Sequence, residues 1–231
     1  MSDPVNPSVD APDYPPELAR LPPGRHDLPR EFVARNQYER LIAGLAEAVA
    51  ENGYAGTTIA HITRHAAVSR RTFYEHFDSK DECFVAAYDT VMAALRERVD
   101  QAFNEEEEWP QAVRAGIAAM LEFLTAEPHL ARLSMVEALV AGPVVVERYD
   151  AAIQGLVPYF EAGRKDRSAE VLAGLSPSTE EALVGGMVSL ISRRIFADRT
   201  EELESLLPDL TEFALTPYLG SAEAAKVARN G

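Results

Sequence analysis

From Pro29 onward, the apolar residues of this chain recur every three to four positions, and no stretch alternates apolar and polar residues as a strand does. The first such stretch stops at Asn52-Gly53, a usual C-terminal end of a helix. It places these apolar side chains on one helical face: Tyr38, Leu41, Ile42, Leu45 and Val49. The pattern predicts an all-α protein.

Helices of different lengths are predicted after the first one. Two short helices are expected at 57–66 and 69–77, and a long one from Ser79 to about Phe103. Pro158 and Pro208 should kink or split the helices that contain them. Further helices are predicted at 111–126, 128–141, 143–163, 179–198 and, with a break, 200–219. This order predicts a small N-terminal three-helix unit joined by a continuous helix to a larger helical bundle.

The two short helices carry the local signals of a helix-turn-helix. Thr57 is a competent N-cap for the first, because a threonine hydroxyl can accept a free backbone N–H. A three-residue turn then ends at Ser69, which caps the second helix. Val68 and Phe73 occupy the positions of a hydrophobic staple, which fixes the entry angle of that helix.

The second short helix should bury Phe73 and Phe77 and keep a polar outer face. The outer positions are Arg70, Arg71, Thr72 and Glu75, with Tyr74 on the flank. Arg70 and Arg71 lie in the first turn, where the helix dipole favours acidic residues, so an external anion explains them. Arginine also reads guanine through two parallel hydrogen bonds. The pattern predicts a helix that enters the major groove of DNA.

The long helix begins with a second cationic anomaly. Ser79 and Glu82 form a capping box, and Lys80 stands between them at the first helical position. A phosphate at this helix end would be held by free N–H groups, the dipole and the Lys80 ammonium together.

The net charge of −15 counts against DNA binding until the charges are located. Residues 25–80 contain eight Arg or Lys and seven Asp or Glu, a net charge of +1. Residues 1–24 have a net charge of −3, and residues 81–231 one of −13. The acidic residues therefore lie outside the predicted DNA-binding segment, which permits binding at that end of the molecule.

Several features point to a cytoplasmic protein. Cys83 is the only cysteine, which excludes an internal disulfide and a multi-cysteine zinc site. No apolar run reaches the roughly 18–20 residues of a membrane span; the nearest, from Met135 to Val146, is interrupted by Glu137. The segment 1–24 contains seven prolines and resembles a disordered arm rather than a secretion signal.

Residues 53–80, GYAGTTIAHITRHAAVSRRTFYEHFDSK, resemble the DNA-binding domain of the TetR (tetracycline-repressor-like) regulators. One departure is Ala67, where the family usually has glycine; alanine needs a left-handed conformation there or an altered turn. The strongest matches are Thr57-Thr58, Ile62, Val68-Ser69, Thr72, Tyr74, His76-Phe77 and Lys80.

The resemblance implies a function and a set of contacts. Thr58, Tyr74 and Lys80 would touch phosphates, and Arg70, Arg71 and Thr72 would approach bases. It also implies a homodimer whose last two helices form a four-helix bundle, and an effector pocket inside the body. Including two further residues of the turn and recognition helix, the expected DNA interface is Thr58, Ser69, Arg70, Arg71, Thr72, Tyr74, His76 and Lys80.

Effector and dimer residues are predicted from the apolar positions of the later helices. Met and aromatic side chains suit irregular apolar ligands. The candidate ligand-binding residues are Met120, Phe123, Leu124, Tyr159, Phe160 and Met187. Two neighbouring apolar helices suit a dimer bundle, although ordinary packing within one chain explains them equally well. The candidate dimer residues are Leu183, Met187, Leu190, Leu206, Leu210 and Phe213.

Two minor features can each be interpreted in two ways. His61 and His65 have a zinc-compatible spacing, but no third ligand is evident, and phosphate contact or solvation fits His61 better. The stretch 25–30 fits either an arm along the minor groove or a disordered tail.

Together these features predict a ligand-responsive transcriptional regulator, most simply a repressor, with no cofactor. It would bind a palindromic double-stranded operator as a homodimer and be released by a small, mainly apolar effector. An all-helical enzyme or a protein-binding adaptor on the same fold stays as the alternative. The expected divisions are an arm at 1–24, the DNA-binding domain at 25–78, an effector and dimerisation domain at 79–220, and a tail at 221–231.

Overall fold

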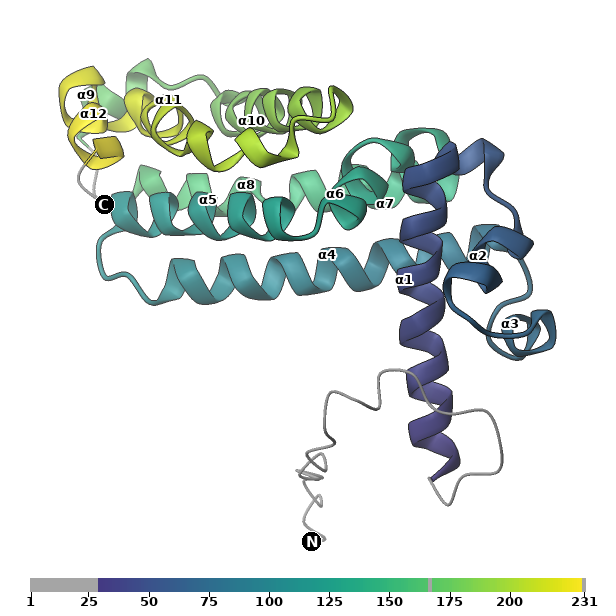
Figure 1. The fold of residues 1–231 in the computed structure, drawn as a ribbon. Coiled ribbons are helices and arrows are strands. Elements are labelled where there is room, and N and C mark those ends of the chain that lie inside the picture. Colours follow the sequence, from purple (N-terminus) through teal and green to yellow (C-terminus); the bar gives the residue numbers. More distant parts are fainter. Residues whose placement is uncertain (1–28, 166–167, 230–231) are drawn as a thin grey trace, which may run out of the picture.

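The computed structural model describes residues 29–165 and 168–229, and every element within these ranges is a helix (Figure 1). This confirms the all-α class. A small group of helices, α1 to α3, is joined by the long helix α4 to a larger body (Figure 1). The predicted arm at 1–24 and most of the stretch 25–30 lie outside the described residues.

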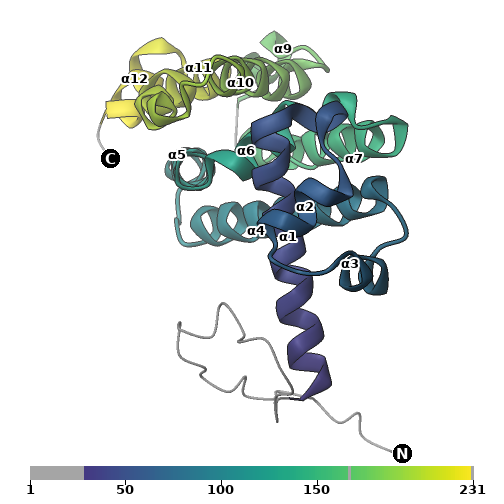
Figure 2. The same cartoon turned by 45° about the vertical axis from the view of Figure 1, so that its right-hand side comes forward.

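The head consists of α1 (Arg30–Gly56), α2 (Ile59–His65) and α3 (Arg70–His76). The apolar stripe of α1 is buried as predicted, with Leu41, Leu45 and Val49 fully enclosed. The helix continues past its predicted end but kinks at Gly53, whose φ of +65° suits glycine. The N-terminal part of α1 extends away from the other helices (Figures 1 and 2).

Helix α4 (Lys80–Asn104) belongs to two hydrophobic cores. Its first half contributes Phe84 and Tyr88 to the core of the head, which also includes Leu133, Ala138 and Val145 of the body. Its second half contributes Val91, Leu95 and Val99 to the core of the body. Because α4 belongs to both cores, a displacement of either core would move this helix.

The body is layered around α5 (Trp109–Ala126), which packs against α4 on one side and α11 on the other (Figure 1). The other elements are α6 (Pro128–Met135), η2 (Glu137–Val140), α7 (Pro143–Gln154), α8 (Val157–Glu161), η3 (Ala162–Arg164), α9 (Ala169–Gly174), α10 (Thr179–Phe196), η4 (Thr200–Glu202), η5 (Glu204–Leu206), α11 (Leu207–Leu219) and α12 (Ser221–Arg229).

One predicted helix of the body was too long, and another is split as expected. The helix expected at 128–141 ends at Met135 and is followed by the short turn η2. The helix expected at 143–163 is split at Gly155-Leu156, just before Pro158. Pro158 then lies in the first turn of α8, and Pro208 in that of α11, where a missing N–H removes no helical bond.

Two helices were not predicted. Helix α9 is short, and α12 occupies most of the segment expected to be a tail. Helix α12 buries Ala224, Ala225 and Ala228 and packs against α5 and α11. Small alanine side chains give a weak apolar periodicity, which explains why the pattern missed it.

A buried carboxylate joins the head to the body. Glu137, at the start of η2, accepts a hydrogen bond of 2.8 Å from the backbone N–H of Tyr54, directly after the kink in α1. Arg132 lies 3.5 Å from the same carboxylate and pairs at 3.0 Å with Asp198, just beyond α10. These contacts connect α1, η2, α6 and the end of α10.

Among the described helices, none is both long and apolar enough to cross a membrane.

Candidate nucleic-acid interface and effector cavity

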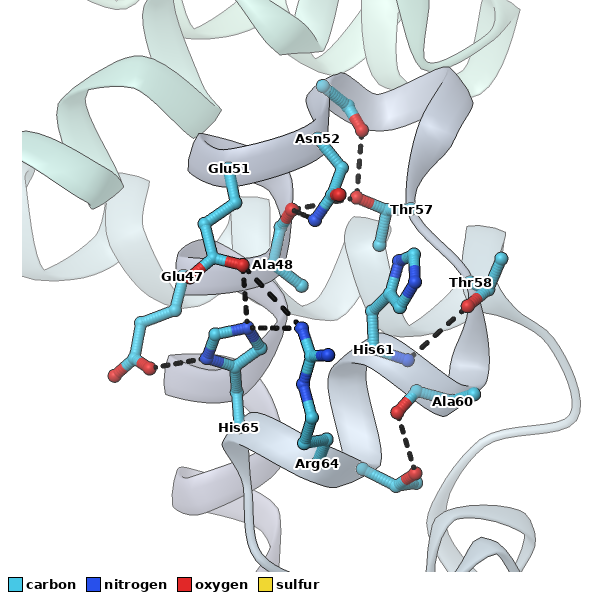
Figure 3. Close-up of polar contacts among 12 residues, drawn as sticks. Glu47, Ala48, Glu51, Asn52, Thr57, Thr58, Ala60, His61, Arg64 and His65 are labelled. Carbon is cyan, nitrogen blue, oxygen red and sulfur yellow. Dashed lines mark hydrogen bonds and ion pairs between the residues drawn. The ribbon is translucent and has the colours of Figure 1, made fainter.

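The first helix of the predicted helix-turn-helix is capped by Thr58 rather than Thr57. The Thr58 hydroxyl accepts the backbone N–H of His61 at 3.3 Å (Figure 3). Thr57 is buried and donates its hydroxyl proton to the α1 carbonyls of Ala48 and Gly53 instead (Figure 3). The prediction failed because both threonines are competent caps locally, and only packing against α1 distinguishes them.

The turn between α2 and α3 is strained at Ala67, whose φ is +49°. This is the first of the two conformations expected for an alanine in place of glycine. The guanidinium of Arg40 on α1 donates a hydrogen bond of 2.8 Å to the Ala67 carbonyl. Sequence reasoning missed Arg40, because its partner lies 27 residues away.

Helix α3 begins and packs as predicted. The Ser69 hydroxyl accepts the Thr72 N–H at 3.0 Å, and Phe73 and Phe77 are buried. The two hydroxyl oxygens of Ser69 and Thr72 also lie 2.9 Å apart. Both residues are therefore engaged in the cap, and Thr72 is only half-buried.

The outer face of α3 is exposed and cationic at its start. Arg70 is exposed and makes no hydrogen bond or ion pair within the described part of the chain. Arg71 forms an ion pair of 3.0 Å with Glu75, one turn later, and its side chain is 89% exposed. Tyr74 is 57% exposed, so a large aromatic ring reaches solvent beside the two arginines.

His76 does not share this outer face. Its ring packs against Tyr38 and Phe77, and Nε2 lies 3.4 Å from the amide oxygen of Gln37 on α1. The prediction that His76 contacts DNA is not supported by this geometry. Its position after the recognition residues gave no signal of this inward orientation.

Lys80 is positioned by Tyr54. Its ammonium donates a hydrogen bond of 2.9 Å to the Tyr54 carbonyl and lies 4.0 Å from the centre of the Tyr54 ring. The Tyr54 hydroxyl donates to Asp81 on the same helix. Because an ammonium has three donors, Lys80 keeps donors for a phosphate at this helix end.

The capping box of α4 differs in one partner. The Ser79 hydroxyl accepts the Glu82 N–H at 3.1 Å, as predicted. The Glu82 carboxylate, however, accepts the N–H of Asp78 at 2.6 Å rather than that of the cap residue. Two side-chain hydrogen bonds, made by Ser79 and Glu82, therefore still stabilise the start of α4.

The two histidines of α2 have separate environments (Figure 3). The ring of His65 lies between Glu47 and Glu51 on α1, with N···O distances of 2.9 and 3.1 Å. Nδ1 of His61 is buried and has no hydrogen-bond partner in the described region. His65 therefore fastens α2 to α1, and residues 29–165 and 168–229 contain no group of three His, Cys, Asp or Glu side chains arranged to hold a metal ion.

An apolar cavity of about 230 Å³ lies inside the body between α4, α5, α7 and α8. Met120, Leu124 and Tyr159 line it, as predicted. Phe160 and Met187 line an adjacent pocket of about 40 Å³, which shares a wall containing Tyr159 with the first. Phe123 lines neither, because its buried ring packs beneath the Arg98 guanidinium.

The candidate dimer residues divide into two groups. Four of them are buried in the core of the body: Leu183, Met187, Leu206 and Leu210. Leu190 is half-buried and Phe213 is 46% exposed. Phe213 lies over Gly186 of α10, where an added Cβ would approach its ring to 3.2 Å. The apolar pattern alone did not separate the internal face of α10 and α11 from the external one.

Burial raises the pKa of the Cys83 thiol to about 12, and the neighbouring Glu82 carboxylate adds to this shift. The thiol is thus held in its protonated form, which is a poor nucleophile.

Residues 41–87, from the middle of α1 into α4, match the family model of the bacterial regulatory proteins of the tetR family. The chain is also 19% identical over 185 residues to the fatty acid metabolism regulator protein of Bacillus subtilis (strain 168). That match covers 79% of this chain and 95% of the relative.

Two solved structures share the fold over most of their length. The fatty acid degradation regulator FadR from Bacillus halodurans superposes with a TM-score of 0.69 at 17% identity, covering 78% of this chain and 94% of FadR. The transcriptional regulator FadR from Bacillus subtilis, in complex with stearoyl-CoA, gives a TM-score of 0.62 at 17% identity, covering 79% and 98%. At these identities the similarity establishes the fold alone.

Proposed function

We propose that this chain, which carries the DNA-binding domain of the tetR-family regulatory proteins at residues 41–87, is a dimeric, effector-released transcriptional repressor. It would act in the cytoplasm on double-stranded operator DNA. The head at 25–78 would bind DNA, and residues 79–220 would bind the effector and the second subunit.

The observation that carries this proposal is the outer face of α3. Arg70, Arg71 and Tyr74 reach solvent together while Phe73 and Phe77 fix the helix from inside. A short helix held in this way can enter a major groove without losing its packing. Arg70 and Arg71 are assigned to base edges.

Phosphate contacts are assigned around this helix. Thr58 and Tyr74 are exposed beside it, and Lys80 is held at the start of α4 by Tyr54. Ser69 and Thr72 would act mainly by capping α3. A lysine–phosphate contact contributes equally to the affinity for every DNA sequence. A bidentate arginine–guanine pair, in contrast, distinguishes one sequence from another.

A second copy of the chain would pack on the outward face of α10 and α11. Phe213 and Leu190 supply apolar area there, and Gly185, where an added Cβ would meet nothing within 4 Å, allows a close approach of helices. A twofold dimer of this kind requires a palindromic operator, with half-sites about 34–36 Å apart for successive major grooves.

The effector would occupy the apolar cavity. A volume of about 230 Å³ has room for roughly eight groups of water or methylene size, at about 30 Å³ each. The stearoyl-CoA in the Bacillus subtilis FadR structure favours an acyl chain as the apolar part. A ligand there would displace α4, and a tilt of this shared helix would misplace both recognition helices. By linkage, effector and operator must weaken one another by the same factor.

A gel-shift titration at moderate salt tests the proposal, using the DNA upstream of the gene and a random duplex of equal length. We expect tighter binding to the upstream fragment, with protection of two inverted half-sites. Equal affinity for both duplexes would favour an enzyme or a protein-binding adaptor on the same fold.

A further inference from the structure

The cavity contains one charged lining residue, and that residue stands at its opening. Of its lining side chains, Arg96 alone is ionised at neutral pH, and the rest are aliphatic, thioether or tyrosine side chains. The two exposed lining residues, Ala93 and Arg96, both lie on α4 and mark where the cavity meets solvent. The cavity thus has an apolar interior and a cationic rim.

The Arg96 guanidinium has unused donors. Its Nε lies 3.6 Å from a carboxylate oxygen of Asp100, an ion pair beyond hydrogen-bond distance. Neither Nη atom takes part in a hydrogen bond within the part of the chain that the structure describes. A guanidinium has five N–H donors in a planar fork that matches a carboxylate or phosphate.

The Arg96 guanidinium lies close to the backbone at the break between α7 and α8. Arg96 Nη1 lies 3.4 Å from the position that a Cβ at Gly155 would occupy, at the break between α7 and α8. Asp100 is itself engaged by the Tyr159 hydroxyl, and Tyr159 lines the cavity wall. Burial and the Asp100 bond raise the pKa of Tyr159 to about 12, so the phenol stays a donor to Asp100.

We propose that Arg96 binds the anionic head of an amphipathic effector, whose unbranched apolar chain fills the cavity. The inference rests on the proposed function of this cavity and specifies the chemical class of its ligand. The head is a carboxylate, as in a free fatty acid, or a phosphate, as in an acyl-coenzyme A. In either case the Arg96 guanidinium pairs with the incoming anion instead of with Asp100, and the Tyr159 hydroxyl keeps its hydrogen bond to Asp100.

Calorimetric titration of the full chain with decanoate, decanol and decanoyl-coenzyme A tests this assignment. Decanol has the same chain without a charge, so it measures the cavity alone. We expect decanoate or decanoyl-coenzyme A to bind more tightly than decanol, and Arg96→Gln to reduce only the binding of the anion by about tenfold, the loss of a charge-assisted contact. Whichever anion loses affinity identifies the carboxylate or the phosphate as the head.

Two further variants separate recognition from structure. Arg98→Gln removes the same charge from the same helix, but Arg98 lies over Phe123 and lines neither pocket, so anion affinity should stay unchanged. Asp100→Asn removes the competing carboxylate and should strengthen anion binding. Equal loss of decanol and anion binding in Arg96→Gln, or unchanged anion binding, would overturn the inference. If no probe binds the wild type while the operator still does, the effector site itself is wrong and DNA binding stands.

Discussion

At the scale of single residues, the head depends on a close approach that the apolar pattern does not express. Gly44, within α1, lies against the end of α2, and a Cβ there would stand 2.6 Å from the backbone nitrogen of Ala66. Backbone atoms cannot give way as a flexible side chain can. This contact fixes the distance between α1 and α2, and so the position of α3.

Gly44→Ala should therefore destabilise the protein by about 1–3 kcal/mol, as overpacking does. The clash outweighs the roughly 1 kcal/mol that alanine gains over glycine in a helix. Urea unfolding checks the prediction. Gly56→Ala on the same helix is the matched control, since its Cβ would make only an ordinary contact of 3.5 Å, and its stability should not fall. Equal stability of the two variants would contradict this account.

The recognition residues make a second prediction at this scale. Arg71→Ala should weaken operator binding by about 1–3 kcal/mol and relax one base position, if its guanidinium leaves Glu75 for a guanine. Lys80→Ala should weaken binding to all DNA sequences alike. It should also reduce the slope of log binding constant against log salt concentration by about one unit. Gel shifts on operator and random DNA at several salt concentrations distinguish the two. Equal loss on both duplexes for Arg71→Ala would rule out base reading.

At the scale of elements, α10 and α11 each have one face in the body core and another toward solvent. Leu183 and Leu210 face the core, so substituting them would unfold the subunit rather than test the dimer. Phe213, exposed and lying over Gly186, is the informative position. The proposed contact surface therefore lies on the outward face of these two helices.

Phe213→Arg should shift the protein toward monomer, because a charge buried without a partner opposes association. Sedimentation velocity at several concentrations measures the shift, and circular dichroism checks that the subunit stays folded. Val146→Arg, at an exposed valine on α7, is the control and should leave the association state unchanged. A Phe213→Arg protein that sediments as the wild type would place the dimer elsewhere.

At the scale of the whole molecule, head and body are connected by α4 and by the contact of Glu137 with Tyr54. The Tyr54 N–H donates a hydrogen bond to the Glu137 carboxylate, and the Tyr54 carbonyl accepts one from the Lys80 ammonium. A shift of η2 therefore reaches a proposed phosphate contact through one residue. Met135, which lines the cavity, lies two positions before Glu137.

Glu137→Ala and Lys80→Ala should accordingly be non-additive in operator affinity. The first leaves the Tyr54 N–H without its acceptor, which costs about 1–3 kcal/mol and loosens the backbone that holds Lys80. A double-mutant cycle on operator DNA measures the coupling, with exposed Glu122→Ala in place of Glu137→Ala as the control cycle. Additivity within about 0.3–0.5 kcal/mol would show that the two sites act independently.

The sequence alone determined the features that depend on near neighbours. The 3.6-residue periodicity identified most helices, and the capping and staple residues identified the helix-turn-helix, because these signals act over a few positions. Ser69, Phe73 and Phe77 behave as predicted for that reason. The all-α class follows from the same periodicity.

Tertiary structure decided what depends on residues far apart in the chain. It selected Thr58 over Thr57 as the cap, turned His76 toward α1, and enclosed Phe123 away from the cavity. Glu137 was visible in the sequence only as an acid that interrupts an apolar run, and its partner Tyr54 lies 83 residues earlier. A cavity is the space that several helices leave unfilled, so no local pattern records its shape or its single cationic rim.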